Sequence, residues 1–263
     1  MAQPAPARPA PARLLDQRRS NDDFEWDAFD SEAYFEHNYR AVRHDDEQII
    51  GIISEFFDRS CVPVRAAQAI DVGPGANLYP TLAMLPFADH VTLYERSRAN
   101  CDWLNRQLRA PAGSWQHFWA KMSADRSSYA ALREPLADLR ARSGVQRGNI
   151  FELPEGRWDL GTMFFVAESI TGVRAEFNQA THTFVRSLRP GAPFAAAFMK
   201  NSQGYNVGGL ALPAFSVDEK YLEDCLRSVA HDVAINQIES RDLRPGYDGM
   251  LVVTGRSGAP NSP

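Results

Sequence analysis

Short, continuous apolar runs alternate along most of the chain with longer stretches in which apolar residues recur at helical spacing. One of them, residues 158–166, is too apolar to face water on either side, which is typical of a strand in the middle of a sheet. The runs cover residues 69–72, 91–95, 158–166 and 193–199, followed by 233–239 and 250–254. The last two are expected to pair as an antiparallel hairpin with a long loop between them.

The intervening stretches predict helices. Residues 127–142 carry leucines at helical spacing, although Pro135 predicts a kink or a break within them. Residues 177–188 and 217–229 predict two further helices. Strands that alternate with helices indicate an α/β fold. We therefore expect a Rossmann-like, seven-stranded sheet with helices on both faces, in which the last strand is antiparallel.

The first two runs end in residues that predict a nucleoside site. Residues 71–75, Asp-Val-Gly-Pro-Gly, form a turn whose glycines allow positive φ and a close approach of the backbone to a ligand. The second run ends in Glu95, about 20 residues further on, where an acid can bind the hydroxyls of a ribose. Both features belong at the carboxyl edge of a parallel sheet.

Two details of the turn favour S-adenosylmethionine as the nucleoside. Leu78 stands where a dinucleotide fingerprint has its third glycine, and Pro74 removes a backbone donor that a pyrophosphate would use. An acid before the first glycine, Asp71, instead suits a ligand with a cationic amino acid end. Glu95 would bind the ribose diol, and the loop would lie against the methionine portion. An ordinary glycine turn of an α/β protein is the alternative.

Composition and charge narrow the classes of function. A hydrophobic fraction of 44% and a charged fraction of 23% are those of an ordinary soluble protein. The net charge of −5 argues against nucleic acid as a partner, because neutralising phosphates requires a basic surface. No apolar run approaches the ~20 residues of a membrane span. The three cysteines lack metal-ligand or disulfide-scaffold spacing, which predicts reduced thiols in a cytoplasmic protein and no metal.

The N-terminal part of the chain divides into two kinds of sequence. Residues 1–13 alternate Ala, Pro and Arg without an apolar core, which predicts a disordered tail up to residue 23 rather than a signal peptide. Residues 28–39 then carry more aromatic side chains than one helix stripe can direct into a core. This aromatic segment either caps the domain by packing or forms a lid over a cofactor.

Two motifs in this chain resemble those of the nicotinamide, phenylethanolamine and thioether N-methyltransferases. Members of that family open with F-[ND]-x-x-x-Y-[LF]-x-x-x-Y, matched here within Phe29–Tyr39, and continue with D-[IV]-G-[SP]-G, matched by Asp71–Gly75. The resemblance extends over residues 29–256. It implies a class I methyltransferase that converts S-adenosylmethionine to S-adenosylhomocysteine. The implied organisation is a tail (1–23), a helical lid segment (24–50) and a methyltransferase domain (51–263).

The resemblance also implies cofactor contacts, position by position. The implied residues are Tyr34 and Tyr39 of the lid, Gly73, Pro74, Gly75 and Asn77 of the loop, Tyr79, Glu95 and Asn100, and the adenine pair Asn149 and Ile150. Asn149 replaces the Asp that the family usually has. Its side-chain carbonyl can still accept a hydrogen bond from the adenine amino group.

The acceptor side of the site depends on positioning more than on a general base. An amine can lose its proton after methyl transfer, and alignment of donor and acceptor supplies much of the catalysis. The candidates for orienting or deprotonating the acceptor are Glu168, His37 and Tyr205. Those for lining the acceptor site are Asn38, Phe164, Phe198, Phe215 and Tyr247. Glu168 has an equally good interpretation as a helix N-terminal residue that interacts with the helix dipole.

These residues predict N-methylation of a small aromatic or heteroaromatic amine. Phe198 stands where nicotinamide-methylating relatives place an acid, and Asn38 replaces a second aromatic residue of the lid, so nicotinamide itself is disfavoured. An aromatic wall favours a flat, apolar acceptor with one polar handle, such as an indole-ethylamine of secondary metabolism. C-methylation of an electron-rich ring, and a non-catalytic module that binds S-adenosylmethionine, are the alternatives. The sequence leaves the oligomeric state open.

Overall fold

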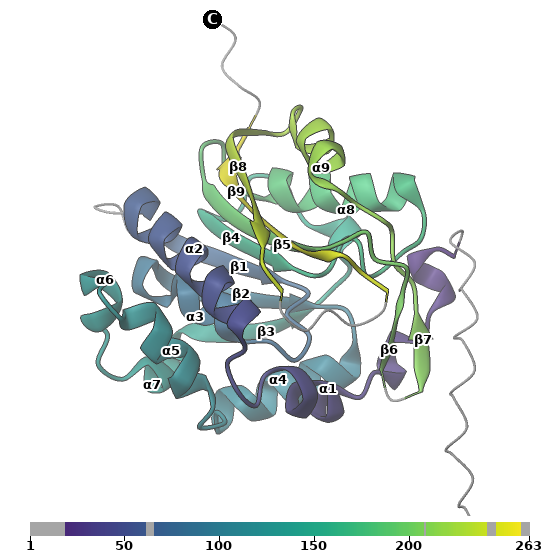
Figure 1. The fold of residues 1–263 in the computed structure, drawn as a ribbon. Coiled ribbons are helices and arrows are strands. Elements are labelled where there is room, and N and C mark those ends of the chain that lie inside the picture. Colours follow the sequence, from purple (N-terminus) through teal and green to yellow (C-terminus); the bar gives the residue numbers. More distant parts are fainter. Residues whose placement is uncertain (1–18, 62–65, 208, 241–245, 259–263) are drawn as a thin grey trace, which may run out of the picture.

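The computed structural model describes residues 19–61, 66–207, 209–240 and 246–258. Their centre is one seven-stranded sheet with the strand order β3-β2-β1-β4-β5-β9-β8 (Figure 1). The strands are β1 (Ala66–Val72), β2 (Ala88–Glu95), β3 (Ser143–Arg147), β4 (Leu160–Phe164), β5 (Pro193–Lys200), β8 (Ala230–Ile238) and β9 (Gly249–Ser257). Strands β1 to β5 pair in parallel, and β9 is antiparallel to both β5 and β8. The predicted α/β sheet with an antiparallel last strand is confirmed.

Helices cover both faces of the sheet, as Figure 1 shows. One face carries α2 (His44–Cys61), α3 (Tyr79–Met84), α4 (Arg98–Arg109), α5 (Trp115–Ser123), α6 (Ser127–Ala130) and α7 (Pro135–Arg142). The other carries α8 (Arg174–Ser187) and α9 (Glu219–Leu226). Side chains of β5 alternate between the two cores: Ala195 and Ala197 pack with the first group, whereas Phe194 and Phe198 pack with the second. Two buried faces explain why this strand has no polar side.

The predicted break at Pro135 is confirmed. Residues 131–134 separate α6 from α7, and Pro135 is the first residue of α7. Proline fits there because the first turn of a helix needs no backbone N–H donor. The predicted helix over residues 217–229 is shorter in the structure, because Asp218 caps the N-terminus of α9 by accepting a hydrogen bond from the Tyr221 N–H at 2.8 Å.

The N-terminal segment starts to pack against the protein before the predicted boundary. Residues 1–18 of the predicted tail lie outside the described residues. Residues 19–23, which were assigned to the tail, instead include the 3-10 turn η1 (Asn21–Asp23). Asp23 stabilises this turn by accepting a hydrogen bond from the Ser20 N–H at 2.7 Å.

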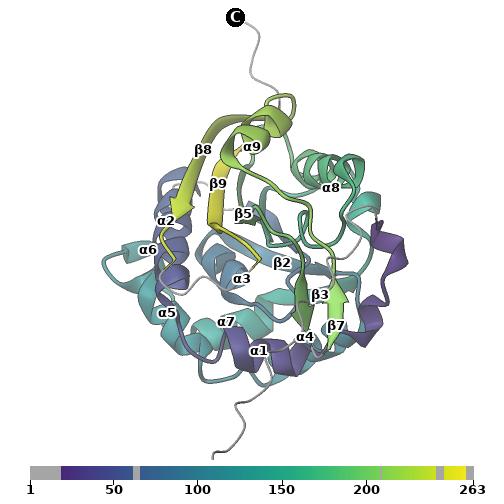
Figure 2. The ribbon, with the colours of Figure 1, turned by 45° about the vertical axis from the view of Figure 1, so that its right-hand side comes forward.

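The rest of the N-terminal segment lies along the carboxyl edge of the sheet. After the 3-10 turn η2 (Trp26–Ala28) comes helix α1 (Ser31–Asn38). A short hairpin, β6 (Tyr205–Val207) and β7 (Leu210–Leu212), packs against this segment through a small apolar cluster that contains Phe24 and Leu212. Figures 1 and 2 both show the hairpin beside the N-terminal segment, away from α6 and α7. No helix within the described ranges is long and apolar enough to cross a membrane.

Candidate active site

A cavity opens at the carboxyl edge of the sheet, between the strand ends and the N-terminal segment. It contains about 860 Å³ of space free of atoms, part of it open to solvent. Its walls come from residues 72–77 after β1, 94–96 at the end of β2, 148–150 after β3, and 164–166 and 169–170 after β4. Residues of the N-terminal segment and Tyr205 of the hairpin cover it. This edge is where ligands bind in open α/β sheets.

The cavity brings together nearly all the predicted cofactor residues. Those that line it are Tyr34, Tyr39, Gly73, Pro74, Gly75, Asn77, Glu95, Asn100, Asn149 and Ile150. Tyr79 does not line it, because its side chain is fully buried behind the lid. The Tyr79 ring lies edge-on to Tyr39 at 6.0 Å and to Phe164 at 5.8 Å between ring centroids. Tyr79 therefore supports two wall residues.

The glycine loop has the backbone conformation that the sequence predicts. Gly73 and Gly75 have φ of +62° and +56°, values that other residues adopt only with strain. A Cβ atom on Gly73 would come within 2.7 Å of the Val166 side chain, so this position also requires the absence of a side chain. The Gly75 N–H points to the neighbouring strand end and donates to Glu95 Oε2 at 3.0 Å. The loop and the acid thus form one unit.

Asp71 does not reach the ligand side of this loop, contrary to the expectation that it faces a cationic amino acid end. Its carboxylate is 1% exposed and accepts hydrogen bonds from Thr81 Oγ1 at 2.6 Å and Thr162 Oγ1 at 2.8 Å. Burial raises its pKa to about 7. Asp71 connects β1 to α3 and β4 beneath the loop, which is a structural role.

Glu95 is the acid that faces the cavity. Its side chain is 6% exposed, and its oxygens accept hydrogen bonds from the Ser97 N–H at 2.8 Å and the Gly75 N–H at 3.0 Å. Burial raises its pKa, and these donors oppose that shift by stabilising the carboxylate. A carboxylate has about four lone-pair sites. The Asn100 side chain and the Arg96 N–H also stabilise the carboxylate by hydrogen bonding, so a pair of hydroxyl groups at Glu95 would have to share or replace some of these donors.

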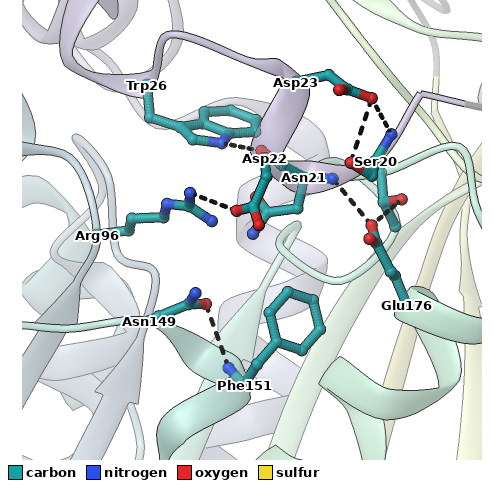
Figure 3. Close-up of polar contacts among 10 residues, drawn as sticks. Ser20, Asn21, Asp22, Asp23, Trp26, Arg96, Asn149, Phe151 and Glu176 are labelled. Atoms are coloured by element: carbon teal, nitrogen blue, oxygen red, sulfur yellow. Dashed lines mark hydrogen bonds and ion pairs between the residues drawn. The ribbon is translucent and has the colours of Figure 1, made fainter.

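Asn149 and Gly148 shape the end of the cavity beyond Glu95. The Asn149 side-chain oxygen accepts a hydrogen bond from the Phe151 N–H at 3.3 Å (Figure 3). Its remaining lone pair and its amide nitrogen can still bind a base. A Cβ atom on Gly148 would overlap the Tyr94 ring at 2.1 Å, so a glycine is needed for this loop to pass the end of β2.

Helix α1 is anchored as a cover over the cavity. Asp30 caps it by accepting a hydrogen bond from the Ala33 N–H at 2.9 Å. The Phe35 ring packs 5.4 Å from that of Trp103, between centroids. Ser31 Oγ donates to the Asn100 side-chain oxygen at 2.7 Å, which ties α1 to the helix after β2. Phe35 thus packs into the core, while Tyr34 and Tyr39 line the cavity.

The predicted acceptor residues divide into two groups. Phe164 and Tyr205 line the cavity, whereas six others do not: His37, Asn38, Glu168, Phe198, Phe215 and Tyr247. His37 is exposed on the outer side of α1, and Asn38 donates a hydrogen bond to the Tyr34 backbone oxygen. Phe198 and Phe215 instead pack against Phe177 of α8, at 6.0 and 5.0 Å between ring centroids.

Glu168 lies behind the cavity wall instead of projecting into the cavity. Its side chain is fully buried, and Oε1 accepts hydrogen bonds from the Met199 N–H at 3.0 Å and from Ser169 Oγ at 3.3 Å. Oε2 has no hydrogen-bond partner among the described residues. Burial raises the Glu168 pKa to about 7. A residue at the end of a strand was expected to project into the cavity. In the structure β4 already ends at Phe164, and a turn separates it from Glu168, so the Glu168 side chain points away from the cavity.

Several wall residues were missed by the sequence analysis. They are Phe29 and Ser169, beside the aromatic end formed by Tyr34, Phe164 and Phe165, together with Ile170, and Asn21, Trp26 and Arg96 beside Asn149. Phe165 has φ of +58°, an unusual value for a bulky residue and one found preferentially at functional sites. The motif Ser20-x-x-Asp23 was an available signal for an ordered turn at Asn21.

Tyr205 brings a hydroxyl group to the aromatic end. Tyr205 Oη donates a hydrogen bond to the Ser169 backbone oxygen at 3.3 Å. Desolvation raises its pKa well above the ordinary value, so the phenol stays protonated near neutral pH. It can hold a polar group of a ligand with its free lone pair but is a poor base. In the part of the chain that the structure describes, no three His, Cys, Asp or Glu side chains are placed to hold a metal.

The chain was compared with protein families and with known proteins. The model of the NNMT/PNMT/TEMT family matches residues 18–256. No curated protein matches the chain.

Solved structures that resemble the chain include methyltransferases. The glycopeptide N-methyltransferase MtfA, complexed with S-adenosylhomocysteine, has a TM-score of 0.51 and 14% identity over 80% of this chain and 90% of its own. N-methyltransferase NodS from Bradyrhizobium japonicum WM9, in complex with the same compound, has a TM-score of 0.50 and 11% identity over 79% and 86%. A SAM-dependent methyltransferase from Methanosarcina mazei has a TM-score of 0.50 and 13% identity over 76% of this chain and 96% of its own. At these identities the likeness concerns the fold, and the predicted class I methyltransferase fold is confirmed.

Proposed function

This chain belongs to the NNMT/PNMT/TEMT family, and we propose that it transfers a methyl group from S-adenosylmethionine to the nitrogen of a small, neutral aromatic or heteroaromatic amine. The observation that carries the acceptor class is the composition of the cavity. Its aromatic end lacks a carboxylate, and its only acid among the described lining residues is Glu95, next to the glycine loop.

The described residues fit the cofactor. Gly75 leaves open space above the loop, where a Cβ atom would meet only the Asn100 amide nitrogen, at 3.9 Å. Glu95 presents its carboxylate to the cavity as an acceptor for a ribose diol, and Tyr34 and Tyr39 of the N-terminal segment close over the loop. When bound, S-adenosylmethionine supplies a methyl group activated by a sulfonium. The role of this chain is to orient both reactants and to exclude water between them.

The aromatic end suits a flat and uncharged acceptor. Phe29, Phe164 and Phe165 contribute apolar rings, and Tyr205 contributes one polar atom. Pockets of this composition bind apolar ligands and fix their orientation through a few polar groups. A protonated amine would lose its hydration there without gaining a carboxylate partner. An indole-ethylamine, named above as a possible acceptor, would therefore react in its neutral form.

Nitrogen is favoured over carbon because the cavity lacks a suitable base. A neutral amine attacks through its lone pair and can release its proton to water afterwards. C-methylation of an indole instead needs removal of the ring N–H proton. Of the three predicted bases, His37 and Glu168 lie outside the cavity, and Tyr205 stays protonated because its pKa is raised. A lone pair already present on nitrogen avoids this requirement.

An acceptor screen read by mass gain of one methyl group tests the proposal. We expect methylation of pyridines and arylamines that are neutral at the assay pH. Substrates that are permanently cationic should give no product, and NMR of the product should place the methyl group on nitrogen. A carbon-bound methyl group would refute N-methylation. Binding of S-adenosylhomocysteine without turnover of any acceptor would favour a non-catalytic binding module.

Tyr205→Phe tests the aromatic end separately. Loss of the hydroxyl should raise KM for the acceptor roughly threefold to tenfold, the range expected for one neutral hydrogen bond. The Kd for S-adenosylhomocysteine should stay unchanged. Tyr247→Phe is the matched control, because it also removes one phenolic hydroxyl but from a residue outside the cavity wall. Equal behaviour of the two variants would argue against a role for Tyr205 in acceptor binding.

A further inference from the structure

The N-terminal strap, residues 19–28, covers the end of the cavity beside Arg96 and Asn149. Asn21 and Trp26 of the strap line this end together with Arg96, Asn149 and Ile150. Figure 3 shows Asn21 and Asp22 of η1 beside the Arg96 guanidinium, with Asn149 below Arg96. Arg96 directly follows Glu95, and the glycine loop contacts Glu95 from the other side. A ribose bound at Glu95 would therefore direct its base toward Arg96 and the strap.

Asn21 is the unexplained residue of the strap. Its side chain is 2% exposed, yet neither Oδ1 nor Nδ2 has a hydrogen-bond partner among the described residues. Most buried polar atoms in folded proteins do have such partners, because burying an amide without them is unfavourable. Arg96 brings a second buried atom without a partner, Nη1, to the same end of the cavity. The Asn21 carboxamide and Arg96 Nη1, none of which has a partner among the described residues, therefore both lie at the wall of the cavity.

The backbone around Asn21 is fixed, so its carboxamide is held in place. The Asn21 N–H donates to Glu176 Oε2 of α8 at 2.8 Å, and the Asn21 carbonyl accepts a hydrogen bond from the Trp26 indole N–H at 2.9 Å. Asp22 forms an ion pair with Arg96 at 2.7 Å between Oδ1 and Nη2 (Figure 3). These three contacts hold a side chain whose own polar atoms have no hydrogen-bond partner among the described residues.

We propose that the Asn21 carboxamide binds the adenine base of the cofactor, so that the strap is part of the cofactor site. A carboxamide presents an acceptor beside a donor, which complements the amino group and the adjacent ring nitrogen of adenine. Asn149 accepts one hydrogen of the amino group and Asn21 the other. The inference rests on the proposed function, since it takes S-adenosylmethionine as the ligand.

Calorimetry with two ligands tests the inference without relying on turnover. The probes are S-adenosylhomocysteine and its 6-deamino analogue, which lacks the exocyclic amino group. In the wild-type protein the analogue should bind at least tenfold more weakly. In Asn21→Leu the ratio of the two Kd values should fall by roughly threefold to tenfold, because one of the two partners of the amino group is gone and Asn149 remains. Asn21→Ala should give the same ratio and guards against a packing defect specific to leucine.

Asp22→Asn is the matched control in the same turn. It weakens the ion pair with Arg96 but keeps the Asn21 carboxamide, so it should leave the ratio of Kd values at the wild-type figure. Thermal unfolding of each variant without ligand shows that the proteins are folded. An unchanged ratio in both Asn21 variants would overturn the inference, as would equal weakening of both ligands. A wild-type protein that fails to bind S-adenosylhomocysteine would instead overturn the proposed function on which the inference rests.

Discussion

Replacing Glu168 with glutamine should change the way in which stability depends on pH. The wild-type carboxyl has a pKa of about 7 in the folded protein, against an ordinary value of 4.5. A group whose pKa is raised on folding binds more protons in the native state. The free energy of unfolding therefore falls as the pH rises through the window from 4.5 to 7.

The size of this effect follows from the shift in pKa. One pKa unit corresponds to about 1.4 kcal/mol, so the shift at Glu168 amounts to on the order of 3 kcal/mol between pH 4 and pH 8. The side chain is fully buried, so solvent does not screen the effect. Glutamine keeps an oxygen for the Met199 N–H but cannot ionise. Relative to wild type, Glu168→Gln should therefore become more stable by roughly 3 kcal/mol as the pH rises over this range.

Urea unfolding of both proteins at pH 4, 6 and 8 measures this difference directly. Groups that titrate alike in both proteins, such as Asp46 and Asp71, cancel when the two curves are subtracted. Glu223→Gln is the matched control, because it makes the same substitution on the exposed side of α9. A difference for Glu168→Gln that stays flat with pH would refute the conclusion that a buried, poorly partnered carboxyl lies behind the wall.

Two further predictions concern the glycine loop and its acid. Glu95→Ala should weaken S-adenosylhomocysteine binding by roughly 1.5–3 kcal/mol for each charge-assisted hydrogen bond lost, as read by calorimetry, and an unchanged Kd would remove Glu95 from the cofactor site. Gly73→Ala should destabilise the protein in urea unfolding by more than Gly156→Ala. Both glycines have φ of +62°, but an added Cβ atom meets Val166 only at Gly73 and open space at Gly156. Equal losses would show that the contact with Val166 is easily relieved.

Local motifs account for the part of the site that sequence predicts well. Gly73 and Gly75 come directly after β1, and Glu95 is the last residue of β2. Because β1 and β2 pair in parallel, their carboxyl ends lie at the same edge of the sheet, and the sequence pattern is enough to place these residues together. The strand β3 was not located, because its Ser-Gly-Val-Gln-Arg sequence and partial exposure leave no apolar run. The hairpin β6–β7 was missed because three-residue strands carry too little pattern.

Side-chain direction accounts for most of the errors. Phe198 belongs to the set of β5 residues that face α8, since neighbouring residues of a strand alternate between faces. Glu168 is separated from the end of β4 by a turn in which Phe165 has a positive φ, and no strand parity carries across such a turn. Asn21 was assigned to a tail because the composition before it is tail-like, whereas its partner Glu176 lies 155 residues away in sequence.

A raised pKa does not by itself identify the reactive group in this protein. Burial raises the pKa values of Asp46, Asp71 and Glu168 to about 7, yet none of the three lines the cavity. Glu168 instead connects the loop after β4 to the end of β5 and to the segment before α9. Its carboxylate holds the Met199 N–H, and its backbone oxygen accepts a hydrogen bond from the Phe215 N–H at 2.7 Å.

The residue after Glu168 shows how this connection reaches the cavity. The Ser169 backbone oxygen accepts the hydrogen bond of Tyr205, so the loop after β4 sets the position of the hydroxyl proposed to hold the acceptor. We therefore expect any effect of Glu168 on the acceptor to act through the positions of Ser169 and Tyr205 rather than by proton transfer. On this argument its replacement by glutamine, which keeps the bond to Met199, alters stability more than it alters the chemistry of methyl transfer.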